Sequence, residues 1–190
     1  MGKIAAIVLA AGEATRFGKP KQRLLLPAVL ARVGDAAPID EIVVVEGAYE
    51  LEIPSDDLSL GIPARVVRCE EWERGPGASL RCGLGALGDD VEAAVVVLAD
   101  GPNLDPTAIE RVLSAWHPDA GIVAASYREE RGHPLVMGRD DWRDIPDEGL
   151  RDRFVRLVPC DDLRAPGDVD TPEDLSALTP GDLPPEVEGK

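Results

Sequence analysis

The chain has 190 residues, of which 44% are hydrophobic, 4% aromatic and 29% charged. This length and apolar content suit one folded domain with an aliphatic core, and they argue against a disordered chain. The formal net charge of −16 at pH 7 argues against nucleic acid and anionic membranes as partners, because both require a cationic face.

The cysteine spacing contains no metal or redox motif. Cys69, Cys82 and Cys160 include no C-x-x-C pair, and their odd number supplies no disulfide framework. We therefore expect three buried, reduced thiols. No apolar run approaches the roughly 20 residues that a membrane span needs. No cleavage site stands out near the N-terminus either, so we expect a cytoplasmic protein.

Apolar runs alternate along the chain with segments of helical spacing, an order that predicts an α/β fold. The run Val95–Leu98 is uninterrupted, which is typical of a strand buried on both faces of a parallel sheet. We predict a Rossmann-like, doubly wound fold with a mostly parallel sheet and helices on both faces. The predicted strands are Lys3–Val8, Ile42–Val45, Ala64–Cys69, Ala93–Ala99, Gly121–Ser126 and Pro134–Met137, and the predicted helices are Ser79–Leu87, Pro106–Trp116 and Leu150–Leu157.

We expect a single domain over residues 1–178. Residues 179–190 are rich in proline, glycine and acids, and we expect them to form a flexible tail. In a doubly wound sheet the ligand crevice lies outside the carboxyl ends of the strands. Residues that directly follow the predicted strands are therefore the candidates for a site.

The loop after the first strand is the clearest candidate. Leu9-Ala10-Ala11-Gly12 brings small residues to the strand end, where backbone N–H groups can approach a ligand closely. Arg16, Lys19 and Lys21 follow, and three clustered cations in so acidic a chain indicate a bound polyphosphate. The loop is neither a G-x-G-x-x-G fingerprint nor a Walker A motif. The alternative is a surface loop that happens to be basic.

Acidic residues follow two later strands. Asp100 precedes Gly101-Pro102, and Mg²⁺ prefers one or two carboxylates together with substrate phosphates; a turn aspartate is the alternative. Asp168 and Asp170 alternate ahead of a helix start at Thr171-Pro172, so both point to one side if the segment is extended. Together with Asp100 they are candidates to hold a divalent ion.

Two further segments are weaker candidates. Gly77 lies in a loop that can approach a ligand, and Ser79 stands where a helix N-cap would, a role compatible with contact to a nucleotide. His133 precedes Pro134 and either faces a substrate or holds a turn, and we favour the first. Two histidines at this spacing do not make a zinc site.

These segments, in this order, resemble the MobA-like nucleotidyltransferases, particularly the branch with molybdenum cofactor cytidylyltransferase. The resemblance covers nearly the whole chain except the tail, and it implies a fold of the nucleotide-diphospho-sugar transferase type. The matching residues are Leu9–Gly12 with Arg16-Phe17-Gly18 and Lys21, Gly77 with Ser79-Leu80-Arg81 and Gly83-Leu84, Leu98-Ala99-Asp100 with Pro102, Gly132-His133-Pro134, and Asp168–Leu175.

The resemblance implies Mg²⁺-dependent transfer of an NMP unit from an NTP to a small phosphorylated acceptor such as molybdopterin, with release of pyrophosphate. We expect a monomer or a small homo-oligomer. An acceptor phosphate is already anionic, so no general base is needed. The implied nucleotide-binding residues are Leu9, Ala10, Ala11, Gly12, Arg16, Lys21, Gly77 and Ser79; the catalytic residues are Arg16, Lys21 and Asp100; His133 would face the acceptor, and Asp100, Asp170 and Asp168 would bind Mg²⁺.

The motif sequences look closer to the cytidylyl than to the guanylyl branch, so we expect CTP as the donor. The chain also departs from the family pattern. The segment Gln22–Val33 is short, which bears on the first helix and the acceptor pocket, and Gly101 stands where relatives often have a larger side chain. The acceptor can therefore differ from molybdopterin.

Two other functions stay open. One is an NAD(P)H-dependent oxidoreductase of the MobA-like family, against which the missing dinucleotide glycines count. The other is a non-catalytic nucleotide-binding protein, which the shortened segment Gln22–Val33 favours.

Overall fold

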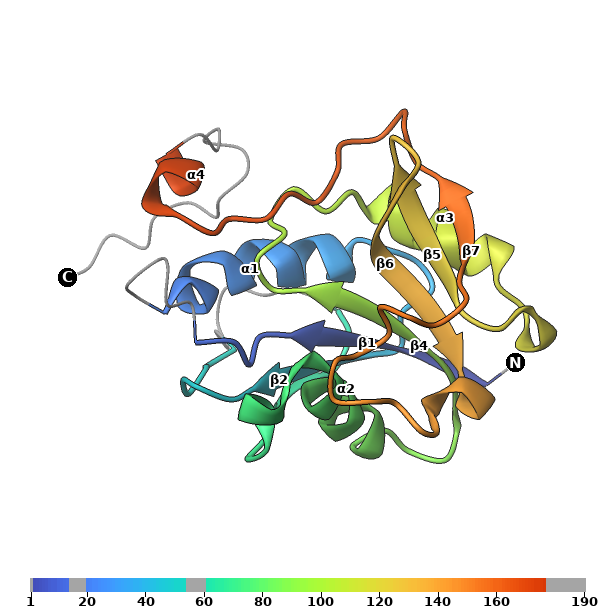
Figure 1. The fold of residues 1–190 in the computed structure, drawn as a ribbon, viewed down its shortest axis with the longest axis horizontal. Coiled ribbons are helices and arrows are strands. Elements are labelled where there is room, and N and C mark those ends of the chain that lie inside the picture. Colours follow the sequence, from blue (N-terminus) through green and yellow to red (C-terminus); the bar gives the residue numbers. More distant parts are fainter. Residues whose placement is uncertain (1, 14–19, 54–60, 177–190) are drawn as a thin grey trace.

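The computed structural model describes residues 2–13, 20–53 and 61–176. Within them, seven strands form one sheet in the order β3-β2-β1-β4-β6-β5-β7 (Figure 1). The first four of these run parallel, β6 is antiparallel to both of its neighbours, and β7 is parallel to β5. The strands are β1 (Lys3–Leu9), β2 (Glu41–Glu46), β3 (Ala64–Arg68), β4 (Val91–Leu98), β5 (Val123–Tyr127), β6 (Glu130–Gly138) and β7 (Arg156–Pro159).

Helices cover both faces of the sheet, as the doubly wound prediction requires. On one face lie α1 (Lys21–Gly34) and α3 (Pro106–Ala115), and on the other lies α2 (Pro76–Gly85). Near the described C-terminal end lies the short α4 (Pro172–Ser176), which Thr171 and Asp174 cap reciprocally. None of the described helices is long and apolar enough to cross a membrane.

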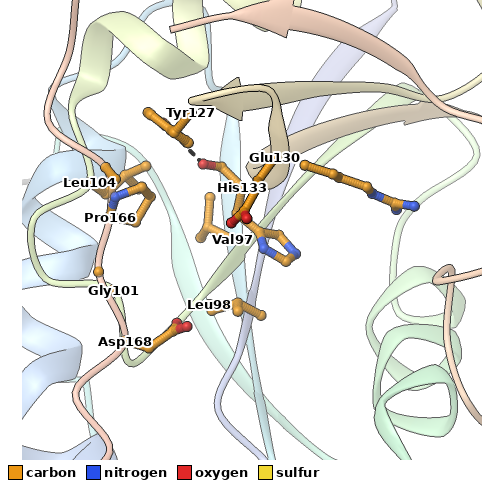
Figure 2. A pocket seen from close by; sticks show the side chains of 13 residues that line it. Val97, Leu98, Gly101, Leu104, Tyr127, Glu130, His133, Pro166 and Asp168 are labelled. Atoms are coloured by element: carbon orange, nitrogen blue, oxygen red, sulfur yellow. Dashed lines mark hydrogen bonds between the residues drawn. The ribbon is translucent and has the colours of Figure 1, made fainter. Parts of the chain in front are cut away.

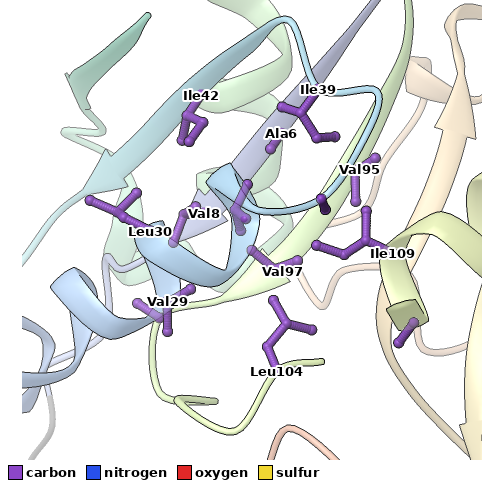
Figure 3. Close-up of a cluster of buried hydrophobic side chains, with 14 of the residues drawn as sticks. Ala6, Val8, Val29, Leu30, Ile39, Ile42, Val95, Val97, Leu104 and Ile109 are labelled. Carbon is purple, nitrogen blue, oxygen red and sulfur yellow. The ribbon is translucent and has the colours of Figure 1, made fainter. Parts of the chain in front are cut away.

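The core explains the uninterrupted apolar runs. Ala6 and Val8 of β1 face α1 and α3 (Figure 3), whereas Ile7 between them faces α2. Successive side chains of a strand point to opposite faces, so a strand covered on both sides must be apolar at every position. The sheet is therefore mostly parallel and doubly wound, as predicted.

The segment Gln22–Val33 forms most of α1, so the first helix is present despite its shortness. Pro27 lies in the interior of this helix and supplies no N–H to its hydrogen-bond ladder. The buried side chains Leu26, Val29 and Leu30 nevertheless pack on the sheet. Burial of this stripe outweighs the local cost of the proline.

The predicted helix Leu150–Leu157 is wrong, because its residues form turns that lead into the edge strand β7. Leu150 is buried, but Phe154 is 92% exposed and Leu157 is also exposed, so the apolar spacing does not build a buried helical stripe. Backbone pairing decides the outcome. The Arg156 N–H donates to the Ile122 carbonyl oxygen at 2.9 Å, and β7 extends the sheet beside β5.

The expectation of three reduced thiols is wrong for two of them. Cys69 directly follows β3, and it forms a disulfide with Cys82 of α2, with the Cα atoms 5.7 Å apart. Cys160 is free and buried. The pairing arises because α2 returns across the end of β3, a tertiary relation that cysteine spacing does not reveal. The expected tail at 179–190 lies outside the described residues.

Candidate active site

A buried lysine joins three segments at the carboxyl edge of β1 and β4. Lys21, the first residue of α1, is 5% exposed. Its Nζ donates to Asp100 Oδ2 at 3.1 Å, to Asp170 Oδ1 at 3.0 Å and to the Val169 carbonyl oxygen at 2.7 Å. Burial opposes the charge, but Asp100 and Asp170 outweigh it and hold the pKa of Lys21 above its ordinary value. The lysine is therefore a fixed cation.

Backbone hydrogen bonds bring the sequence motifs together at this lysine. The Ala99 N–H donates to the Leu9 carbonyl oxygen at 3.0 Å, so Asp100 lies beside Leu9–Gly12, the first motif of the sequence. The Val169 N–H donates to the Asp100 carbonyl oxygen at 3.1 Å, which ties the late acidic segment to the same place. Val169 was not predicted as a site residue, because a backbone carbonyl leaves no signal in the sequence.

The residues here offer a divalent cation two carboxylates rather than three. Oδ1 of Asp100 is buried and has no hydrogen-bond partner, which leaves an oxygen for a cation. Burial and the nearby Asp100 and Asp170 carboxylates raise the pKa of Asp168, a sign of excess negative charge. Among the described residues, however, no group of three or more His, Cys, Asp or Glu side chains is placed to hold a metal ion. Asp100 and Asp170 suit Mg²⁺ that completes its shell with substrate phosphates.

A cavity of about 390 Å³ opens beside Asp100. Leu98 and Gly101 line it from the end of β4, His133 from β6 and Asp168 from the late acidic segment (Figure 2). A Cβ at Gly101 would lie 2.9 Å from Pro166 Cβ, so the small residue here allows the segment before Asp168 to pack closely. The unusual glycine of the sequence thus has a structural reason.

His133 faces this cavity as a neutral ring. Burial and the Arg131 guanidinium lower its pKa to about 4, although Asp100 acts in the opposite direction. Its carbonyl oxygen accepts a hydrogen bond from the Tyr127 hydroxyl at 3.2 Å, which links the two strands of the β5–β6 hairpin (Figure 2). Arg131 and Tyr127 also line the cavity and were not predicted.

Gly77 and Ser79 lie apart from the lysine, on the face that α2 covers. The Gly77 N–H donates to the Asp147 carbonyl oxygen at 2.9 Å, and a Cβ at Gly77 would overlap the Pro146 carbonyl oxygen. Ser79 is buried inside α2, and Gly75 is the N-cap, so the capping role expected for Ser79 is wrong. The close approach of Pro146 accounts for the glycine without a ligand.

The structure thus gathers Lys21, Asp100, Asp168, Asp170 and His133 around one edge of the sheet. The first motif ends at the same edge, at Leu9–Gly12. Arg16, predicted to hold the triphosphate, and its neighbour Lys19 lie outside the described residues.

Comparison with known proteins gives consistent matches. The family model of the MobA-like NTP transferase domain matches residues 6–156. Molybdenum cofactor guanylyltransferase of Rhodobacter capsulatus is 31% identical over 185 residues, which are 92% of this chain and 94% of that protein. A homolog of Mycobacterium tuberculosis Rv0371c from Mycobacterium sp. strain JC1 is 26% identical with a TM-score of 0.71, covering 92% and 93% of the two chains. The Rv0371c complex with manganese from M. tuberculosis H37Rv has a TM-score of 0.64 at 26% identity, covering 93% of this chain and 97% of that chain.

These matches identify the family and the fold. The matched residues 6–156 include Lys21, Asp100 and His133. The fold is of the nucleotide-diphospho-sugar transferase type, and the comparisons give no support to the oxidoreductase alternative. The chain therefore belongs to the MobA-like NTP transferase family, and it is a nucleotidyltransferase, as the order of its motifs predicted.

Proposed function

We propose that this protein transfers CMP from CTP to a small phosphorylated acceptor such as molybdopterin, with Mg²⁺ as the metal and pyrophosphate as the leaving group. The observation that carries the proposal is the Lys21 cluster. Its ammonium lies against Asp100 and Asp170, at the sheet edge where the first motif ends and beside the 390 Å³ cavity. The first motif supports a nucleotide there, and the cavity supports an acceptor.

For this reaction the protein must position the two substrates and balance the charge of their phosphates, and it need not supply a nucleophile. An acceptor phosphate oxygen forms the new bond to the α-phosphorus, and the bond to the bridging oxygen of pyrophosphate breaks. Lys21 is a permanent cation for the phosphates, and neutral His133 can hydrogen-bond the acceptor without adding charge. Mg²⁺ held by Asp100 and Asp170 would neutralise charge on the phosphate oxygens.

The choice of CTP and Mg²⁺ belongs to the same proposal. CTP rests on Leu9-Ala10-Ala11-Gly12 and on the segment from Gly77 to Arg81, whereas the similar R. capsulatus protein is a guanylyltransferase. A divalent metal is supported by the manganese complex of a structural relative. A cytoplasmic location and a monomer or small homo-oligomer complete the proposal. The non-catalytic alternative rested on the short segment Gln22–Val33, and that segment forms most of α1.

Thermal unfolding with CTP or GTP, each with and without Mg²⁺, tests the donor first, since a ligand that binds only the folded state raises Tm. We expect the largest Mg²⁺-dependent rise with CTP. A rise with GTP alone would overturn the choice of base but not the reaction class. No rise with either nucleotide would contradict the proposal.

Pyrophosphate release with molybdopterin as acceptor tests the chemistry. We expect Asp100→Asn to lower kcat on the order of 10²-fold, because its carboxylate lies where the phosphate charge must be balanced. Asp119→Asn, an equal loss of charge at an exposed position of the 3₁₀ turn Pro118–Ala120, is the matched control and should keep the wild-type rate. Equal rates for the two variants would exclude the role given to Asp100.

A further inference from the structure

Three successive carbonyl groups at the end of the first motif and just after it are each held by a different partner. The Ala11 oxygen accepts from the Ala48 N–H at 3.0 Å. The Gly12 oxygen accepts from Gln22 Nε2 at 2.7 Å, and the Glu13 oxygen accepts from the Tyr49 hydroxyl at 2.9 Å. Three carbonyls in a row are thus turned toward the protein.

The backbone N–H groups of the same stretch lack such partners among the described residues. In the described part of the chain, the Gly12 and Glu13 N–H groups donate no hydrogen bond, and both residues are exposed. In a trans peptide the carbonyl and the following N–H point in opposite directions. Holding the carbonyls of Ala11 and Gly12 therefore turns the N–H groups of Gly12 and Glu13 away from the protein. Successive free N–H groups form an anion-binding concavity.

Gln22 is an unusual residue for its position. It is 4% exposed and follows Lys21 in the first turn of α1, so adjacent side chains hold the acidic segment and the first motif. Its Oε1 is buried without a hydrogen-bond partner in the described residues. Burying an acceptor without a donor lowers the free energy of unfolding. The position of Gln22 therefore gives the hydrogen bond from Nε2 to the Gly12 oxygen but lowers the stability of the fold.

We propose that Gln22 and Tyr49 are positioning residues for the triphosphate: Gln22 orients the Gly12–Glu13 peptide, whose N–H would receive a phosphate oxygen, and Tyr49 holds the adjacent Glu13 carbonyl in place. The inference rests on the proposed function, since it takes a nucleoside triphosphate as the ligand. It adds two side chains that need not touch the ligand.

Substitutions of Gln22 and Tyr49 can separate the hydrogen bonds that these side chains donate from the space that they fill. Gln22→Met keeps the length but removes the donor together with the unpaired acceptor, and Gln22→Glu keeps the shape but leaves only acceptors. Tyr49→Phe removes one hydroxyl. Leu24→Met, at an exposed position of the same helix, is the control. The ligands are CTP, CMP and inorganic pyrophosphate, measured by calorimetry with Mg²⁺, together with Tm.

We expect Gln22→Met to weaken CTP and pyrophosphate about tenfold, the loss of roughly one charge-assisted hydrogen bond. Gln22→Glu should lower the affinities for CTP and pyrophosphate further, and Tyr49→Phe should lower them less. The affinity for CMP should change little in all three variants. In turnover, the KM for CTP should rise while kcat stays close to the wild-type value. Wild-type affinities in all three variants would overturn the inference, and so would equal losses for CTP and CMP that follow a fall in Tm. A wild-type protein that binds neither CTP, GTP nor pyrophosphate would instead overturn the proposed function, and this inference with it.

Discussion

At the scale of single residues, His133 in the cavity should make the stability of the fold depend on pH. Burial and Arg131 lower its pKa to about 4, whereas an unperturbed histidine titrates near 6.5. Between these values the unfolded chain binds a proton that the folded chain does not. The free energy of unfolding should therefore be highest above about pH 6.5 and fall as the pH drops toward 4, by at most about 3 kcal/mol from this group.

Urea unfolding of wild type and His133→Gln at about pH 7.5 and about pH 4.5 measures this effect. Carboxylates titrate in the same window in both proteins, so the difference between the two pH dependences isolates the ring. The variant should lose less stability on acidification. Identical losses would show that the imidazole is not held neutral in the fold.

Lys21 offers a second prediction at this scale. Lys21→Met leaves Asp100 and Asp170 facing each other without a cation, which should destabilise the fold by about 2 kcal/mol. The loss is smaller than for a fully buried pair because these carboxylates are 28% and 33% exposed. Adding Asp170→Asn should recover part of it in urea unfolding. A double variant less stable than Lys21→Met would contradict charge balance as the cause.

Most residues of this site were predictable because they follow strand ends; His133, which lies within β6, was instead predicted as the residue that opens a late apolar run. Lys21, Asp100 and Asp170 stand in or after segments that the crevice rule selects, and the structure brings them together. Gln22 and Tyr49 were not predictable, because their hydrogen bonds to the Gly12 and Glu13 carbonyl oxygens depend on the path that the chain takes after β1. Ser79 was misread as a cap because the helix begins earlier, at Pro76.

At the scale of elements, the start of α2 tests how closely two segments pack. Gly77→Ala places a methyl group against the Pro146 carbonyl and should cost roughly 1–3 kcal/mol. Gly85→Ala, in the same helix, meets nothing within 4 Å and should be neutral or slightly stabilising. Urea unfolding of the pair measures the contrast. Equal stabilities would mean that the Pro146 segment moves aside freely.

Elements were predictable where the hydrophobic pattern had one interpretation. The strands with continuous apolar runs became β1, β2 and β4, because burial on both faces leaves no other use for such runs. Leu150–Leu157 failed because apolar spacing that fits a helix also fits a turn followed by an edge strand, and the free edge of β5 decides between them. Pairing partners are absent from a single sequence.

At the scale of the whole molecule, the disulfide Cys69–Cys82 makes a prediction about thiols. Protein purified without reductant and unfolded in denaturant should show one reactive thiol per chain, that of Cys160, and three after reduction. Reduction should destabilise the fold by about 3 kcal/mol, the scale expected for a closed loop of about 15 residues. Three thiols before reduction would exclude the disulfide. A reducing cytoplasm would itself favour the open form.

The fold class was predictable at this scale, but the strand order was not. Uninterrupted runs indicate a parallel sheet with two covered faces, yet nothing in them places β6 between β4 and β5. That insertion is what brings His133 to the cavity. The register pairs Val96 with Leu135, and its continuation sets His133 opposite Leu98, at the same edge as Asp100.

The reversed direction of β6 has a consequence for how such an enzyme can diversify. The parallel half of the sheet ends in the first motif, and the antiparallel half begins with the hairpin that walls the cavity. Under the proposed function, the parallel half would contact the donor and the β5–β6 hairpin would contact the acceptor, and the two halves meet beside Asp100. Exchanging the β5–β6 hairpin between relatives should therefore transplant acceptor preference while the donor base stays the same. A successful exchange would show that donor and acceptor specificity can change independently on the two sides of the β4–β6 pair.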